Sequence, residues 1–187
     1  SQQVTTLEMA EAYATIASGG IHRESTCIEE IVNLKGKTIY KPDTTGERVI
    51  TEQVAYKTTK VMQGVISGDG TAPDAALANG RECAGKTGTS ENYRDSWFCG
   101  FTPEYSVAIW IGNRHEKPTG MITASSVFPL FMDQALADVE PKKFEEKENP
   151  PFTPIDADAL AISSTGYNAV DGAHSAYSYD FTYSSKS

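Results

Sequence analysis

The sequence predicts an α+β fold in which helices pack on an antiparallel sheet. Three strand-like segments follow one another at residues 82–90, 96–101 and 105–111, with short turns between them. Such short turns join antiparallel neighbours, because parallel strands need a crossover of about a dozen or more residues. Amphipathic helical patterns lie before and after this group of strands. This separation of strands from helices is typical of the α+β class.

The segment before the first strand predicts a helix and a small hairpin. Thr5 and Glu8 form a capping box that marks the start of the helix, and the two glycines at 19–20 mark its end. Residues 28–34 and 37–40 then read as two short strands around a Lys-Gly turn. The small residues of the helix indicate that it lies close to a neighbouring element.

Two further helices are expected. One begins at the N-cap Thr51 and ends at Gly68, and a short helical piece follows at 73–78. The other covers residues 122–138 despite Pro129. Helical spacing predicts the apolar faces of the three helices as Leu7, Ala10, Ala14 and Ala17; Val54, Thr58, Val61, Met62 and Val65; and Ile122, Val127, Leu130, Phe131, Ala135 and Leu136.

The strand patterns also predict register and burial. A turn near residues 92–93 places Cys99 opposite Lys86 in a hairpin. Cys83 then points to the opposite face of the sheet from Cys99, so no disulfide is expected between them. Residues 107–111 are apolar without interruption, which is typical of a strand that is buried on both faces.

Composition divides the chain at about residue 140. Residues 1–140 carry the helix and strand patterns, so they are predicted to form a domain. Residues 141–187 are rich in Pro, Ser and Tyr and poor in large aliphatic residues, so they are predicted to be a flexible linker and tail.

Charge excludes one class of function. The chain has 16 basic and 25 acidic residues, a net charge of −9. Nucleic-acid binding needs a basic face, so no nucleic-acid partner is expected. The three histidines lie far apart in the sequence, and none has a partner at metal-ligand spacing. No metal and no cofactor are expected.

One lysine among small residues is the strongest chemical signal, and it fits two patterns. Residues 80–87 match the phosphate-binding pattern G-x-x-x-x-G-K-S/T. Lys86-Thr87-Gly88 is also the third motif of serine enzymes that react with penicillin. A phosphate loop needs a helix directly after its Lys-Thr, and Gly88 with the turn residues that follow it argues against one. A nucleotide-binding loop is therefore the less favoured interpretation.

The residues after the lysine carry a family resemblance. Lys86-Thr87-Gly88-Thr89 is followed by Asp-Ser-Trp-Phe-Cys-Gly-Phe-Thr-Pro at 95–103 and then by the apolar strand at 105–112. This series resembles the transpeptidase domain of class A, bifunctional penicillin-binding proteins. Residues 70–72, Gly-Thr-Ala, also resemble a family element. The resemblance covers residues 4–138 and implies the C-terminal part of the penicillin-binding fold.

The resemblance implies a function and a set of site residues. The family cross-links peptidoglycan: an activated serine attacks the D-Ala-D-Ala stem peptide, and β-lactams stall the enzyme as an acyl-enzyme. Lys86 would act in proton transfer and carboxylate recognition, and the N–H of Thr89 would be an oxyanion donor. The hydroxyls of Thr87 and Thr89 would bind the terminal carboxylate, and Gly88 would admit the substrate backbone. The implied location is the extracytoplasmic face of the bacterial membrane, through an anchor outside this chain.

The sequence also departs from the family. The nucleophile motif S-x-x-K is absent, and the only S-x-N match, residues 90–92, follows the lysine instead of preceding it. The isolated chain is therefore expected to be inactive until the remaining N-terminal part of the domain, with the first two of five strands, is supplied. The alternative is a non-catalytic module that binds stem peptides or a partner. Asp95, Trp97 and Phe98 are expected to fix the turn and to pack the sheet.

Overall fold

The computed structural model describes residues 3–113, 115, 117–120 and 122–146. They belong to one compact unit, residues 1–147, and the second unit, residues 148–187, lies outside the described residues. The predicted tail therefore lies outside them except for residues 141–146. Among the described helices, none is long and apolar enough to cross a membrane.

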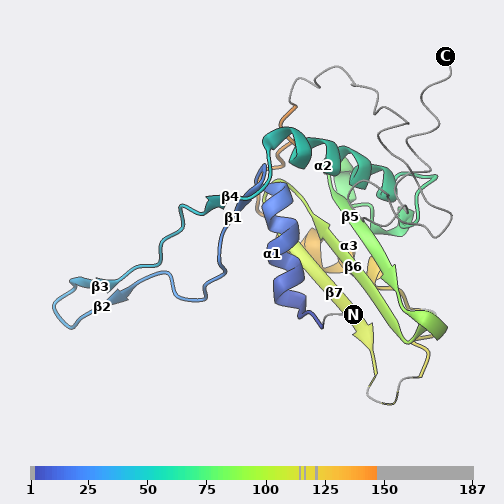
Figure 1. Cartoon of the computed structure of the whole chain (residues 1–187), viewed down its shortest axis with the longest axis horizontal. Helices are drawn as coiled ribbons and strands as arrows, with labels where there is room; N and C mark the ends of the chain where they lie inside the picture. Colours follow the sequence, from blue (N-terminus) through green and yellow to red (C-terminus); the bar gives the residue numbers. More distant parts are fainter. Residues whose placement is uncertain (1–2, 114, 116, 121, 147–187) are drawn as a thin grey trace, which may run out of the picture. The chain divides into compact units, whose positions relative to one another are not determined.

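The centre of this unit is an antiparallel sheet of three strands, β5 (Ala84–Thr89), β6 (Asp95–Phe101) and β7 (Ser106–Gly112), in the order β5-β6-β7 (Figure 1). Lys86 pairs with Cys99, which confirms the predicted register. The α+β class and its antiparallel sheet are confirmed as well.

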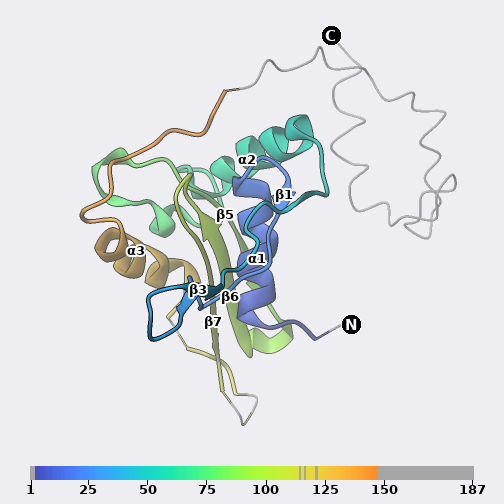
Figure 2. The ribbon, with the colours of Figure 1, turned by 90° about the vertical axis from the view of Figure 1, so that its left-hand side faces the viewer.

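Helices cover both faces of this sheet, as Figure 2 shows. Helix α3 (Ala124–Ala135) lies on one face, where Phe98 of β6 packs edge-on against Phe128. Helix α1 (Thr6–Ala17) lies on the other face, where Phe101 packs against Tyr13. Helix α2 (Glu52–Ile66) lies along β5 and contributes residues to both cores.

The predicted helix caps are confirmed. Thr5 and Glu8 form the capping box of α1, and Gly19 and Gly20 after its end have φ of 72° and 97°. The Thr51 hydroxyl accepts a hydrogen bond from the N–H of Val54 at the start of α2.

The predicted apolar faces of the helices are partly wrong. In α1, Leu7 and Ala14 are exposed, and the residues that pack on the sheet are Tyr13, Ile16 and Ala17. Each helix has apolar residues on more than one side, so spacing alone does not show which side meets the sheet.

The same error occurs in the other two helices, where large residues of the predicted face point away from the sheet. In α2, Met62 and Val65 pack against the core as predicted, but Val54 and Val61 are exposed. The buried residues of this helix are Ala55, Thr59 and Ile66. On the predicted face of α3, Leu136 is buried as expected, but Leu130 and Phe131 are exposed. The buried residues within the helix are Ala124, Ser125, Phe128 and Met132.

Short elements connect these parts. Strands β1 (Ile21–His22) and β4 (Glu47–Arg48) pair with each other, and between them β2 (Ile31–Val32) pairs with β3 (Thr38–Tyr40), so the predicted hairpin is present with shorter strands. The short helical piece consists of two 3₁₀ turns, and a third such turn separates β5 from β6; these are η1 (Pro73–Ala75), η2 (Ala78–Gly80) and η3 (Glu91–Tyr93).

The prediction that β7 is buried on both faces is wrong. Val107, Ile109 and Ile111 pack toward α3, but the residues of the other face are incompletely covered, and Trp110 is 47% exposed. The reason is that α1 covers only part of that face and that β7 is an edge strand among the described residues.

Residues 139–146 belong to this unit and pack beside the segment that precedes β5. Arg81 and Glu104 form a buried ion pair of 2.9 Å, and the N–H of Lys142 donates to the same Glu104 oxygen at 2.8 Å. Phe144 is buried against Phe101, with ring centroids 5.5 Å apart. The packed unit therefore extends past the boundary that composition suggested at residue 140.

Candidate functional site

Strand β5 presents the candidate site at an edge of the sheet. Among the described residues it pairs with β6 on one side only. Its start is closed, because Ala84 and Gly85 are buried, whereas Lys86 and Thr89 are exposed. The accessible part of this edge is therefore Lys86-Thr87-Gly88-Thr89, the motif that the sequence singled out.

The side chain of Lys86 turns along its own strand. Its Nζ donates a hydrogen bond of 2.9 Å to the carbonyl oxygen of Thr87 and approaches the Oγ1 of the same residue at 3.3 Å. Within the part of the chain that the structure describes, no carboxylate forms an ion pair with Lys86. The ammonium group is thus a positive charge at the sheet edge that is available to an anionic ligand.

Thr71 lies beside this motif, although sequence reasoning did not assign it to the site. The Oγ1 of Thr71 is 3.2 Å from the Oγ1 of Thr87. Thr71 belongs to the Gly-Thr-Ala segment at 70–72, so the resemblance of that segment to a family element was the signal that could have identified it.

Two glycines in β5 are in different environments. A β-carbon added at Gly85 would lie 2.6 Å from the Cζ of Phe98, which is closer than such atoms approach in proteins. At Gly88 the nearest atom would be the Cβ of Trp97 at 3.2 Å, a tight contact that a small shift relieves. Gly85 is therefore required by packing within the fold, whereas Gly88 keeps the open part of the edge free of side-chain atoms.

The turn after β5 is held in an unusual backbone conformation. Asn92 and Tyr93 have φ of 59° and 55°, the left-handed region that costs energy for residues other than glycine. Both the N–H and the hydroxyl of Thr119 donate to the carbonyl of Tyr93, at 2.9 and 3.3 Å. A pocket of about 310 Å³ lies at this end of the strand, lined by Ser90, Glu91, Arg94, Asp95 and Asn113.

Asp95 fixes the same turn, as expected from the sequence. Its N–H donates to the hydroxyl of Ser90 at 2.8 Å, and its Oδ1 accepts from the indole Nε1–H of Trp110, also at 2.8 Å. Hydrogen bonds from Ser90 and then Trp110 lower the pKa of the Asp95 carboxyl. Asp95 is therefore an ionised structural group, and Phe98, which is fully buried, is a core residue.

The two buried cysteines do not offer an alternative nucleophile. Cys83 and Cys99 are free thiols, and burial raises the pKa of each to about 11. A thiol reacts as its thiolate, so both are unreactive near neutral pH.

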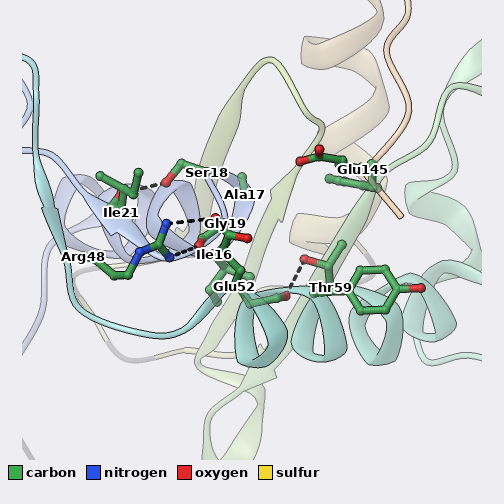
Figure 3. A pocket seen from close by; sticks show the side chains of 12 residues that line it. Ile16, Ala17, Ser18, Gly19, Ile21, Arg48, Glu52, Thr59 and Glu145 are labelled. Carbon is green, nitrogen blue, oxygen red and sulfur yellow. Dashed lines mark hydrogen bonds and ion pairs between the residues drawn. The ribbon is translucent and has the colours of Figure 1, made fainter. Parts of the chain in front are cut away.

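A second pocket, of about 300 Å³, lies away from the motif (Figure 3). The end of α1, the start of α2 and residues 144–145 line it, and none of residues 86–89 does. On one wall, Arg48 donates to the carbonyl of Gly19 at 2.7 Å and pairs with Glu52 at 3.2 Å. This pocket is therefore separate from the β5 edge.

The geometry of β5 decides between the two sequence patterns. Lys86 and Thr87 lie inside an extended strand that continues to Thr89, and the 3₁₀ turn that follows spans only residues 91–93. A phosphate loop needs a helix N-terminus at this point, so its geometry is missing here. A strand edge with a lysine, two hydroxyls and a glycine instead suits an extended peptide with a terminal carboxylate.

Comparison with known proteins agrees with this geometry. Residues 1–133 match the family described as the penicillin binding protein transpeptidase domain. Penicillin-binding protein 1A of Clostridium botulinum is 36% identical over 127 residues, which cover 68% of this chain but only 15% of that protein.

Solved structures show the same similarity. The penicillin-binding protein PonA1 of Mycobacterium tuberculosis superposes with a TM-score of 0.67 and 28% identity over 81% of this chain and 45% of that one. The D,D-transpeptidase domain of a peptidoglycan glycosyltransferase from Eggerthella lenta gives 0.60 and 29%, over 74% and 33%.

The family model covers well over half of the chain, and the 1A relative confirms the class A resemblance. The chain therefore belongs to the penicillin-binding protein transpeptidase family and corresponds to a part of that domain.

Proposed function

We propose that this chain is part of a peptidoglycan D,D-transpeptidase that cross-links stem peptides by serine acyl transfer and binds β-lactams. The observation that carries the proposal is the accessible β5 edge, where Lys86-Thr87-Gly88-Thr89 lies within the matched family region. The parent protein acts on D-Ala-D-Ala peptides at the extracytoplasmic face of the bacterial membrane.

Each residue of the edge has a role in this proposal. The substrate lies along β5 as an added strand, and Gly88 lets its backbone approach. The hydroxyls of Thr87 and Thr89 bind the terminal carboxylate, which the charge of Lys86 attracts. The N–H of Thr89 donates to the oxyanion that forms when the serine attacks, and Lys86 takes part in the proton transfers.

The serine, its lysine base and the second motif come from a segment that precedes Ser1 in the parent protein. The state of β7 supports this part of the proposal. It has the sequence of a central strand, yet it is an edge strand in the described residues and leaves Trp110 half-exposed. The first two strands of the domain complete the sheet beyond β7, so the isolated chain has an incomplete site and is inactive.

Labelling with a fluorescent penicillin tests the proposal. The isolated chain and the complete domain from the parent gene are incubated with the probe, and labelled serines are mapped by mass spectrometry. We expect label only on the complete domain, at the serine of S-x-x-K. A covalent label on the isolated chain, or none on the complete domain, contradicts the proposal.

A second candidate is a non-catalytic module that binds stem peptides or a partner protein. The same experiment separates the two functions, because a parent protein without the serine would bind a D-Ala-D-Ala peptide reversibly and never take up the covalent label.

A further inference from the structure

We propose that Thr71 directs the hydroxyl hydrogen of Thr87 toward the terminal carboxylate of the substrate, and is thus a positioning residue. The inference rests on the proposed function, in which Thr87 binds that carboxylate. Its basis is the distance of 3.2 Å between the two Oγ1 atoms, which come from segments 16 residues apart.

The turn that carries Thr71 is fixed to the end of α2. The N–H of Ala72 donates to the carbonyl of Val65 at 2.9 Å, and Ala72 is fully buried. A β-carbon added at Gly70 would lie only 2.2 Å from the same carbonyl oxygen, so the backbone there is in close contact with the helix. The position of Thr71 beside β5 is therefore set by the backbone on both sides of it.

The turn is also fixed to the start of α3. The Oδ2 of Asp74 accepts hydrogen bonds from the hydroxyls of Thr123 and Ser125, at 3.1 and 3.0 Å. The N–H of Ala124 donates to the hydroxyl of Ser96, so the start of α3 is held to β6 as well. Thr71 itself stays exposed, so a ligand at the β5 edge can lie next to the hydroxyl pair.

The hydrogen-bonding capacity of Thr87 limits what its hydroxyl can do. A hydroxyl has one hydrogen to donate and two lone pairs. The Nζ of Lys86 lies 3.3 Å from Oγ1 and can only donate, so it occupies one lone pair. If Thr87 donated to Thr71, it would have no hydrogen left for a ligand. If Thr71 donates to Thr87, the Thr87 hydrogen is free.

A bound carboxylate selects the second arrangement, because a carboxylate can only accept. Thr71 and Lys86 then both donate to Thr87, and Thr87 donates to the carboxylate. Hydrogen bonds in such a chain polarise one another, and a charged acceptor makes the last of them the strongest. Thr71 therefore acts on the carboxylate without touching it.

The test uses the complete domain with either Thr71→Val, which removes the hydroxyl and keeps the shape, or Thr71→Ser, which keeps the hydroxyl. The second-order acylation rate constant is measured for a penicillin with a free carboxylate and for its methyl ester. We expect Thr71→Val to lower the rate for the free acid about 5- to 10-fold, as for the loss of one hydrogen bond. The ester rate and the Thr71→Ser rates should change by less than about two-fold.

The ratio of the acid and ester rates is the decisive readout, because loss of folded protein lowers both rates equally. In a Thr87→Val background, Thr71→Val should have no further effect on this ratio. Thr44→Val, at an exposed threonine of the β3–β4 segment, is the matched control and should leave the ratio unchanged.

Equal losses for acid and ester, or an equal loss with Thr71→Ser, would overturn the inference. If Thr71→Val does not fold, Thr71→Ala takes its place in the same comparison. These outcomes differ from failure of the proposed function itself, in which the wild-type domain is not acylated at all.

Discussion

The two edges of the three-stranded sheet differ in the polarity of their side chains. The β5 edge is polar, has small residues and is bordered by fixed turns that contain Thr71 and Tyr93. The β7 edge is apolar and leaves Trp110 half-exposed. An edge for a transient peptide needs polar groups and free backbone, whereas an edge for permanent strand pairing needs apolar side chains. We infer that β5 receives the substrate and β7 the remainder of the domain.

The largest effect is expected at the β5 edge itself. In the complete domain, Lys86→Ala removes the amine that is proposed to take part in the proton transfers. Acylation by penicillin should therefore slow by about 10²- to 10⁴-fold. Stopped-flow fluorescence measures the rate. Lys57→Ala, at an exposed lysine of α2, is the control and should leave it unchanged. If both variants acylate at the wild-type rate, β5 is not the catalytic edge.

The next largest effect is expected where β5 begins. Glu104→Ala leaves Arg81 buried without its partner, and such a change costs about 3–5 kcal/mol of unfolding free energy. Arg81 also donates to the carbonyls of Leu136 and Val139, so the variant should weaken the contact with residues 139–146. Chemical denaturation of the isolated chain measures the loss, with Glu24→Ala, an exposed residue, as the control.

The carboxyl of Glu104 should also make the stability of the fold depend on pH. Burial raises the pKa of Glu104, but hydrogen bonds from Thr102 and from the Lys142 N–H, together with the Arg81 charge, outweigh it and leave the pKa lowered. A lowered pKa in the folded state adds stability that is present above the unfolded-state pKa of about 4.3 and is lost as pH falls through the folded value. Glu104→Gln should reduce this loss of stability at acid pH. Chemical denaturation at a series of pH values measures it, and an unchanged pH dependence of the unfolding free energy would contradict the assignment.

A smaller effect should separate the two glycines of β5. Gly85→Ala forces a β-carbon against Phe98 and should destabilise the fold by about 1–3 kcal/mol, as overpacking does. Gly88→Ala has only a tight contact with Trp97 and should cost less stability, while it slows acylation by narrowing the approach to the edge. Thermal unfolding and penicillin acylation are measured for both variants. The reverse order of the two stability losses would place the open part of the edge at Gly85.

The smallest effect is expected at β7. Trp110→Phe keeps an apolar ring but loses the indole hydrogen bond to Asp95, so it should lower the unfolding free energy by less than Gly85→Ala does. The pKa of Asp95 should also rise toward its ordinary value, and NMR titration of the carboxyl measures this. An unchanged pKa would show that the hydrogen bonds from Ser90 alone hold it down.

The sequence predicted well the features that local chemistry determines. The capping residues Thr5 and Thr51 are in place, because a side-chain oxygen at the N-cap satisfies a nearby N–H whatever the tertiary fold. The register that pairs Lys86 with Cys99 followed from the position of one turn. Both signals lie within a few residues of the structure that they determine.

The faces of the helices were not predictable in the same way. The buried residues of α2 include the small side chains of Ala55 and Thr59, whereas Val54 and Val61 are exposed. A hydrophobic pattern gives most weight to large residues, although two of the most buried positions of this helix carry small ones. Likewise, nothing in the spacing of Thr71 and Thr87 indicates that their hydroxyls meet, because folding of the intervening turn brings them together.

The burial of Phe144 limits where the polypeptide can be truncated. Its ring covers Phe101, and its N–H donates to the carboxylate of Glu82 just before β5. A polypeptide that ends after helix α3 would leave Phe101 open to water and the Glu82 carboxylate without this donor. Losing a buried phenylalanine costs about 3–5 kcal/mol, a large part of the stability of a small domain. Recombinant versions that stop near residue 140 should therefore express poorly or aggregate, and soluble versions should retain residue 144 and the residues that follow it directly.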